Sequence, residues 1–318
     1  MSVVVSRRPG GDDPRVTSPG PALSDRALRA AVEVAEAHGL RFSRPVVLRD
    51  LSNLLVHLRP APVVARVSTA TGTMRPGEAW LAREVAVAGH LAAAGAPVVA
   101  PSAELPPGPH RHDGLALSFW TFAAETPGAL DAEAAGRALR VCHEALADFP
   151  GPLPEHAVFR EARRVLAGLG TRGALAVPDA QLLERAAERL EDRLAALALP
   201  LQAVHGDAHL GNVIQTPAGP LWNDWEDTFR GPVAWDLGCL HASARVFGGD
   251  PAAVAAAQRG YGAAPAPEVL DLLVEARAFQ GTVWTVLISG DRPGGPERVA
   301  ARLAWFRARE RRSAGQDG

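Results

Sequence analysis

The stretch Val204–Leu237 reads VHGDAHLGNVIQTPAGPLWNDWEDTFRGPVAWDL and places many polar side chains in an apolar frame. Two short apolar runs, Val213-Ile214 and Leu221-Trp222, flank the pair Gly219-Pro220. Apolar runs separated by Gly and Pro are typical of a β-hairpin with its turn at those residues. The stretch therefore predicts a hairpin whose two ends carry polar groups and lie next to each other.

Those polar groups suit one particular chemistry. Asp207 and Asn212 precede the first run and Asp224 follows the second, so a hairpin would let all three converge. One carboxylate that accepts a hydroxyl proton, with an Asn and a second carboxylate on Mg²⁺, is sufficient for in-line attack on a γ-phosphate. Because Mg²⁺ keeps several waters and the nucleotide phosphates as ligands, two protein oxygens suffice. The pattern indicates phosphoryl transfer.

Three motifs in this stretch resemble those of one enzyme group. H-G-D-x-H-x-x-N spans His205–Asn212, D-W-E-D begins at Asp224, and W-D-L spans Trp235–Leu237. This order and spacing resemble the aminoglycoside phosphotransferase and choline kinase group, small-molecule kinases with the protein-kinase fold. The resemblance covers roughly Val46 to Val246. It implies an α+β fold with a small N-terminal sheet lobe and a mainly helical C-terminal lobe, with ATP and Mg²⁺ between the lobes.

The resemblance also implies roles for single residues. Asp207 would be the catalytic residue that orients the substrate hydroxyl and accepts its proton, and His205 would support its loop. Asn212 and Asp224 would be the metal ligands. The roles of three further residues stay open: His209, Glu226 and Asp227.

Upstream, three apolar runs at 46–48, 54–58 and 63–67 predict short strands. The sequence Val64-Ala65-Arg66-Val67 resembles the kinase V-A-I-K strand, with Arg66 where Lys is usual. Glu84 lies in a helix predicted from Glu78 to Ala94 and matches the family's Glu that pairs with the strand cation. The resemblance therefore implies that Arg66 binds the nucleotide phosphates and that Glu84 holds Arg66.

The turn between the first two strands contains Ser52-Asn53, which resembles the family's S-N in the loop that covers the phosphates. The resemblance implies that both residues bind the nucleotide. The loop has no glycine, however, and glycine allows close approach of the backbone to phosphate. Taken alone, this turn favours an ordinary hairpin.

The boundaries of the tail, the first helix and the two lobes follow from composition and from residues that begin or end helices. Residues 1–22 are rich in Gly, Pro, Asp and Arg and predict a disordered tail. Ser24 predicts the N-cap of a helix that stops at Gly39. We expect a nucleotide-binding lobe over 23–123 and a catalytic, substrate-binding lobe over 124–318, with a hinge after a strand at 115–122.

Composition excludes several classes of protein. The 318-residue chain has a formal net charge of -2, which argues against a partner that is a nucleic acid or a membrane surface. It contains no Lys, so a Walker A loop and Schiff-base chemistry through Lys are excluded. Without a signal-like segment or a long apolar run, we expect a soluble, cytoplasmic protein.

Two other functions stay open at this point. A metal-dependent hydrolase could use the alternating His205, Asp207 and His209, with Asp224 and His241 as further ligands. A catalytically inactive kinase-like binding protein would fit the glycine-free loop and the missing Lys. For a kinase, the acceptor is a small-molecule hydroxyl compound: an aminoglycoside, macrolide, choline-like alcohol, sugar or amino-acid alcohol.

One acidic pattern bears on the acceptor. Glu268, Asp271 and Glu275 lie on one face of a predicted helix. Such acids could hold a polycationic substrate, but a stripe of this kind is more often a solvated face. The oligomeric state stays open.

Overall fold

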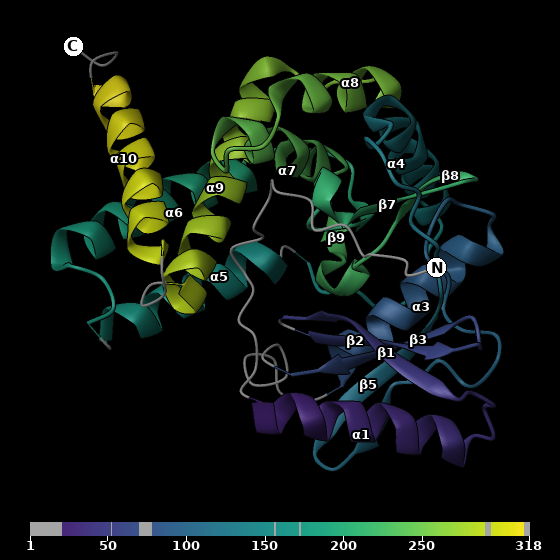
Figure 1. The fold of residues 1–318 in the computed structure, drawn as a ribbon. Helices are drawn as coiled ribbons and strands as arrows, with labels where there is room; N and C mark the ends of the chain where they lie inside the picture. Colours follow the sequence, from purple (N-terminus) through teal and green to yellow (C-terminus); the bar gives the residue numbers. More distant parts are fainter. Residues whose placement is uncertain are drawn as a thin grey trace. The chain divides into compact units, whose positions relative to one another are not determined.

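The computed structural model describes residues 21–51, 53–69, 78–155, 157–171, 173–289 and 294–314 (Figure 1). By packing, the chain divides into two compact units. Of the described residues, the sheet unit comprises those of 21–153 and 212–228, and the helical unit comprises those of 154–211 and 229–314. The chain thus returns to the sheet unit between two passages through the helical unit. The predicted lobe boundary at 123 and 124 stays a prediction.

The sheet unit is built on five antiparallel strands in the order β1-β2-β3-β5-β4. These are β1 (Arg44–Asp50), β2 (Asn53–Arg59), β3 (Val63–Ser68), β4 (His110–His112) and β5 (Leu115–Thr121). The first three and β5 confirm the predicted strands, whereas β4 was not predicted. Strand β3 is the central strand of this sheet and pairs with β2 and β5 on its two edges.

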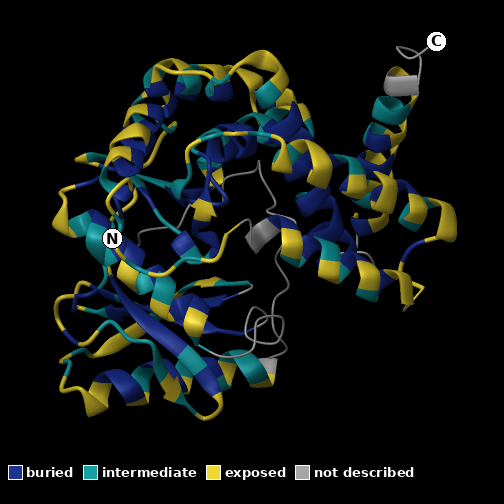
Figure 2. Cartoon of the chain, turned by 180° about the vertical axis from the view of Figure 1, so that it is seen from behind, coloured by how far each residue is buried: buried dark blue, intermediate teal, exposed yellow. Residues whose placement is uncertain are grey.

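Helix α1 (Pro21–Ala37) packs on this sheet. Ala27, Ala30 and Ala31 recur at helical spacing and are buried with Val56 and Phe119 of the sheet, while the opposite face of α1 is exposed (Figure 2). Small alanines allow the helix to lie close to the strands. The core of the sheet unit is therefore formed by one amphipathic helix and one sheet face.

The start of α1 differs from the prediction. The helix begins at Pro21, three residues before the predicted cap, and the Ser24 hydroxyl donates a hydrogen bond to Asp50 Oδ2 at 2.8 Å. Pro is well suited to the first turn of a helix because its missing N–H would be unsatisfied there. The predicted end is confirmed, because Gly39 has a φ of 76°.

Two helices and a hairpin complete the sheet unit. They are α3 (Ala79–Ala93), α4 (Ala132–Leu146), β7 (Val213–Thr216) and β8 (Gly219–Trp222). The Asp131 side chain caps α4 by accepting a hydrogen bond from the Ala134 N–H at 2.9 Å. Helix α4 packs on β8, where the indole of Trp222 donates to the Ala135 carbonyl at 3.0 Å. The hairpin is thus anchored by a fully buried tryptophan.

The helical unit is centred on α9 (Pro267–Ser289), which packs against four other helices. The other elements are α5 (Ala157–Thr171), α6 (Val177–Ala195), α7 (Ala234–Arg245), α8 (Pro251–Tyr261), α10 (Gly295–Ala314) and the antiparallel pair β6 (Gln202–Val204) and β9 (Phe229–Gly231). A helix enclosed by neighbours is apolar nearly all round. A charged side chain that α9 buries must therefore find a partner.

The small antiparallel sheet and the mainly helical remainder confirm the predicted α+β class. Within the described ranges, we find no helix with an apolar stretch of membrane-spanning length.

Candidate active site

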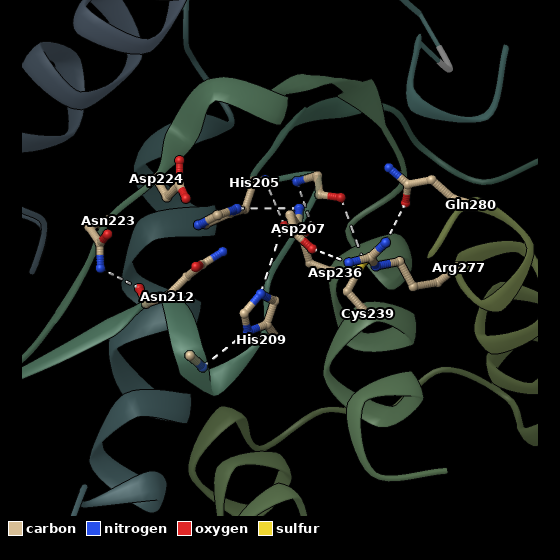
Figure 3. Close-up of polar contacts among 12 residues, drawn as sticks. His205, Asp207, His209, Asn212, Asn223, Asp224, Asp236, Cys239, Arg277 and Gln280 are labelled. Carbon is tan, nitrogen blue, oxygen red and sulfur yellow. Dashed lines mark hydrogen bonds and ion pairs between the residues drawn. The ribbon is translucent and has the colours of Figure 1, made fainter. Parts of the chain in front are cut away.

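The β7–β8 hairpin holds the two predicted metal ligands at its ends. Val213 pairs with Trp222, so the residues just outside this pair, Asn212 and Asn223, lie opposite each other. The main-chain N–H of Asn223 donates to the Asn212 carbonyl at 3.0 Å, and its side-chain Nδ2 donates to the same oxygen at 2.9 Å (Figure 3). The main chain of Asn212 is therefore tied to the residue that precedes Asp224.

The hairpin itself confirms the prediction, but its turn lies earlier than predicted. Thr216 pairs with Gly219 across a two-residue loop at Pro217-Ala218, and Gly219-Pro220 already belongs to β8. The Thr216 hydroxyl donates to the Gly219 carbonyl at 2.7 Å and accepts from the Ala218 N–H at 3.2 Å. Pro at the first central position of a turn and a Thr that bonds its own turn explain this placement.

Asp224 has an unusual main-chain conformation. Its φ of 67° and ψ of 56° are left-handed, a region that Asp tolerates better than most residues. The short helix η2 (Trp225–Asp227) follows directly. Asp224 Oδ1 lies 3.1 Å from Arg66 Nη2, and 34% of the Asp224 side chain is exposed. Its carboxylate is therefore both ordered by a cation and accessible to a ligand.

Arg66 on β3 is the centre of a cluster of carboxylates. Its Nη1 donates to Glu84 on α3, and its Nη2 donates to Asp224 and to Glu226 on η2. Arg83 donates to the Glu226 carbonyl at 2.8 Å, which ties η2 to α3. The predicted Arg66–Glu84 pair is thus present, and it is buried on both sides.

The cluster contains more negative than positive charge, and this changes its titration. Burial is the main factor that raises the pKa of Glu84 to about 8. The negative charges of Asp224 and Glu226 add to this rise, and the positive charge of Arg66 opposes it. Burial alone would lower the pKa of Arg66, but the three carboxylates raise it above its ordinary value. Glu84 Oε2 is buried without a hydrogen-bond partner among the described residues, which suits a carboxyl that retains its proton.

In the helical unit, α7 holds the loop that carries the H-G-D motif. The Asp236 carboxylate accepts the main-chain N–H groups of His205 at 2.7 Å and Gly206 at 2.9 Å. The indole of Trp235 donates to the Gly206 carbonyl at 3.0 Å, and the Cys239 thiol lies 3.6 Å from the same oxygen. The W-D-L motif therefore fixes the backbone from which the next residue projects.

Asp207 is that residue, and it is buried to 2% exposure. Its Oδ1 accepts from Arg277 Nη2 on α9, and its Oδ2 lies 3.6 Å from Nε2 of His209 (Figure 3). The His205 ring accepts the Asp207 N–H at 3.3 Å, as expected for a residue that supports the loop. The His209 ring accepts the Gly211 N–H at 3.0 Å. The two carboxylate oxygens of Asp207 thus have different surroundings.

The predicted site residues fall into two groups. Asn53, Arg66, Glu84, Asn212 and Asp224 belong to the sheet unit, and Asp207 belongs to the helical unit. Arg66, Glu84 and Asp224 meet directly. Asn53 is the first residue of β2, paired with Ser68, and its carbonyl accepts the Leu51 N–H at 3.2 Å. Ser52 lies outside the described residues.

Sequence analysis missed two partners. It did not predict Glu226 as a ligand of Arg66, although an acid two positions after Asp224 is within reach of the same cation. It also missed Arg277. This residue lies on α9 in V-E-A-R-A-F (residues 274–279), where charged and apolar residues alternate, so no local pattern identified it as buried and paired.

The acidic stripe on α9 proves to be largely neutralised, so its interpretation as a solvated face is wrong in part. Glu275 is buried and pairs with Arg189 and with Arg309, the latter at 2.9 Å. Asp271 pairs with Arg245 at 2.6 Å. These two acids already have cations and offer little to a polycationic substrate.

The geometry does not favour the metal-dependent hydrolase. No three or more His, Cys, Asp or Glu side chains form a metal-binding group in the part of the chain that the structure describes. Asp207 is paired with a guanidinium, which competes with a metal for its oxygens. His241 bonds to Gln258 at 2.9 Å, and burial lowers its pKa.

Comparison with known proteins agrees with this geometry. The model of the phosphotransferase enzyme family matches residues 43–273. The chain therefore belongs to this family. No curated protein sequence matches it.

Three solved structures illustrate the likeness. A choline/ethanolamine kinase family protein from Mesorhizobium loti has 19% identity and a TM-score of 0.63, covering 90% of this chain and 94% of that one. An amicoumacin kinase in complex with AMP-PNP, Ca²⁺ and Ami has 14% identity and a TM-score of 0.68, covering 87% and 93%. An aminoglycoside phosphotransferase from Streptomyces rimosus has 20% identity and a TM-score of 0.55, covering 80% and 98%.

At these identities the likeness shows the fold, which is protein-kinase-like and confirms the predicted architecture. Family membership and the kinase neighbours together support a small-molecule phosphotransferase.

Proposed function

We propose that this chain is a small-molecule kinase that transfers the γ-phosphate of ATP to a hydroxyl group, with Mg²⁺ as its metal. One observation carries the proposal. Arg66, Glu84 and Asp224 come from a strand, a helix and the turn after a hairpin, and they meet in one cluster. These are residues for which the family resemblance implies handling of phosphate and metal.

The side chains present fit Mg²⁺ and a nucleotide. Asp224 and the side-chain oxygen of Asn212 are the hard oxygen donors that Mg²⁺ prefers, and Asp224 is partly exposed. The excess of carboxylates around Arg66 favours binding of an additional cation. Bound Mg²⁺ would neutralise charge on the phosphates. Arg66 would contact a phosphate oxygen through its guanidinium, and Glu84 would keep Nη1 in place.

Asp207 performs the remaining task. The acceptor oxygen attacks the γ-phosphorus, the bond from phosphorus to the bridging oxygen breaks, and ADP leaves. The hydroxyl proton passes to Asp207. Little base strength is needed, because the transition state of phosphoryl transfer is loose and the proton moves late. The task of Asp207 is therefore mainly to orient the hydroxyl.

The acceptor class follows only in outline. The kinase neighbours include enzymes named for choline or ethanolamine, for amicoumacin and for aminoglycosides. In this chain two acids of α9, Asp271 and Glu275, are engaged by arginines, and the formal net charge is only -2. We therefore place an uncharged or weakly charged alcohol, such as a macrolide or a sugar, ahead of a polycation.

The test is consumption of ATP by the purified protein across a panel of hydroxyl compounds, with Mg²⁺, with Zn²⁺ and without metal. We expect consumption that depends on Mg²⁺, is slow with water as acceptor, is accelerated by one class of acceptor, and is absent in Asp207→Asn. Consumption that persists without any acceptor and survives in Asp207→Asn would contradict a kinase that uses Asp207.

A further inference from the structure

Arg277 has no role in the proposed reaction, yet it contacts the residue that is central to it. Arg277 is 6% exposed and its guanidinium donates to Oδ1 of Asp207, a residue that is itself 2% exposed. Taking a guanidinium and a carboxylate out of water is costly unless the two are well paired. A buried pair at this position therefore needs an explanation beyond stability.

The guanidinium of Arg277 is itself held from several sides. Its Nη1 donates to Gln280 Oε1 at 2.9 Å, and its plane lies over the ring of Phe247 at 5.6 Å. Arg302 lies over the same ring at 4.5 Å and donates to the Gly281 carbonyl at 2.7 Å. A Cβ at Gly281 would come within 2.6 Å of the Phe247 ring, so this glycine leaves room for the ring. Arg277 is thus a preoriented donor.

A fixed donor on one oxygen makes the two oxygens of Asp207 unequal. Oδ1 is engaged by Arg277, whereas Oδ2 faces His209 at 3.6 Å, which is longer than a hydrogen bond. An engaged Oδ1 restricts the rotation of the carboxylate plane. In a reaction that depends on orientation, a displacement of about 1 Å can cost roughly 100-fold in rate.

We propose that Arg277 is a positioning residue that locks Asp207 through Oδ1 and so presents Oδ2 to the acceptor hydroxyl. This inference rests on the proposed kinase function. It assigns Arg277 to orientation of the base and not to binding of the nucleotide or of an anionic group of the acceptor.

Several charged or titratable side chains of the described residues lie around Asp207 and bear on its pH dependence. Arg277 faces its carboxylate from α9, and His209 faces it from the same loop. The His205 ring contacts the Asp207 main chain, and the Asp236 carboxylate on α7 is occupied by main-chain N–H groups. Removal of the Arg277 charge should therefore dominate any change in titration of Asp207.

The experiment compares Arg277→Gln, Arg277→Lys and the matched control Arg309→Gln. Arg309 pairs with the buried Glu275, also on α9, so its loss removes a part-buried ion pair of the same helix away from Asp207. For each variant we would measure melting temperature, affinity for Mg²⁺ with AMP-PNP, and the rate of hydrolysis of Mg²⁺-ATP with water as acceptor across pH.

In Arg277→Gln we expect nucleotide affinity within about twofold of wild type but hydrolysis slower by about 10- to 100-fold. The acid limb of the rate profile should move up by about one pH unit or more, because a nearby cation favours the carboxylate. Arg277→Lys should restore the acid limb, but only part of the rate, because an ammonium lacks the planar fork. Arg309→Gln should change neither.

A pH titration of the Asp207 carboxyl carbon by NMR tests the effect of Arg277 on Asp207 without turnover. The resonance is assigned by its absence in Asp207→Asn. An unchanged midpoint in Arg277→Gln, an unchanged rate, or a loss of nucleotide affinity as large as the loss of rate would overturn the inference. Failure of the wild-type protein to bind Mg²⁺ with AMP-PNP would instead count against the proposed function, and the NMR result would still decide whether Arg277 controls Asp207.

Discussion

Two buried arginines mark the two groups of candidate site residues, and they differ in their charge balance. Arg66 in the sheet unit is surrounded by Glu84, Asp224 and Glu226. Arg277 in the helical unit pairs with the single carboxylate of Asp207 and is further held by a neutral glutamine and an aromatic ring.

The difference shows what each site is suited to do. The Arg66 cluster has an excess of negative charge and a carboxyl whose pKa is raised by burial, so it gains stability by taking up a cation. The Arg277 pair is balanced and gains nothing from a metal. The first arrangement suits a nucleotide with its divalent ion, and the second suits a base that must stay ionised in one orientation.

The largest expected effect is the loss of turnover on substitution of Asp207, without a loss of nucleotide affinity. Asp207→Ala should lower turnover of an identified acceptor by about 100- to 10,000-fold, the usual contribution of a general base. Affinity for Mg²⁺ with AMP-PNP should persist, because Asp207 belongs to the acceptor side. Steady-state kinetics and calorimetry check both statements, and near-full activity in this variant would remove Asp207 from the mechanism.

The next effect concerns the metal. Asp224→Ala should weaken binding of AMP-PNP in Mg²⁺ by about 100-fold or more, since metal contacts are worth several kcal/mol. Asn212→Ala should weaken it less, because Asn carries no charge. With EDTA in place of Mg²⁺, both variants should resemble wild type. Equal losses with and without Mg²⁺ would show that these residues act on the nucleotide or the fold and not through a metal.

Substitution of Arg66, the central residue of the sheet-unit cluster, tests whether that cluster binds ATP. Arg66→Ala should weaken ATP affinity by about 10- to 100-fold, the value of one charge-assisted bond, and should raise the KM for ATP more than that for the acceptor. Arg66→Lys should recover only part, because an ammonium cannot bridge Glu84 and a phosphate as a planar fork does. Unchanged affinity in Arg66→Ala would remove Arg66 from the site.

Substitution of Glu84, the partner of Arg66, tests whether the two residues act together. Glu84→Ala should give a smaller loss of ATP affinity in the same direction, because Arg66 would remain but drift. The double variant Arg66→Ala with Glu84→Ala should be non-additive, since the two side chains act as one unit. Strict additivity in the measured dissociation constants would show that the two residues act independently.

The last prediction concerns the stability of the fold as pH changes. The pKa of Glu84 is raised from its ordinary 4.5 to about 8, so between these values the folded protein binds more protons than the unfolded chain. Its contribution to the free energy of unfolding is therefore present at low pH and is lost as pH rises to about 8, by up to about 1.4 kcal/mol per pH unit.

Urea unfolding at several pH values checks this sign. Glu84→Gln should flatten the fall in stability between about pH 5 and 8. Glu310 provides the control, because its hydrogen bond with Arg185 lowers its pKa and moves its titration below that range. A Glu310→Gln variant should keep the wild-type slope, and an equal slope in Glu84→Gln would show that Glu84 is ionised throughout.

Much of the fold could be predicted because local patterns decide it. The β7–β8 hairpin, the strand with Arg66 and the helix with Glu84 each depend on residues within one short segment. Strand β4 was missed although Asp113-Gly114 separates it from β5, and both residues have the positive φ that a tight hairpin turn requires. That failure was one of interpretation, because the dipeptide is a strong local indication of a hairpin.

Other features depend on contacts far apart in the chain. Arg277 is 70 residues from Asp207, and no local motif connects them. The Ser24 hydroxyl bonds to Asp50 across 26 residues and is not available as a helix cap. Likewise, Glu275 lies on a face that looks solvated by periodicity but is covered by Arg189 and Arg309. Helical spacing says which residues share a face, and only packing says what covers that face.

The central claim is transfer of phosphate to a carbon-bound hydroxyl group by a site with Asp207 as base. The most direct measurement is ³¹P NMR of Mg²⁺-ATP with the purified protein and the acceptor that promotes ATP consumption. We predict one new phosphate monoester resonance that grows in step with ADP, and no such resonance with Asp207→Asn. Release of inorganic phosphate alone, or stoichiometric bound Zn²⁺ that is lost in His205→Ala, would contradict the account.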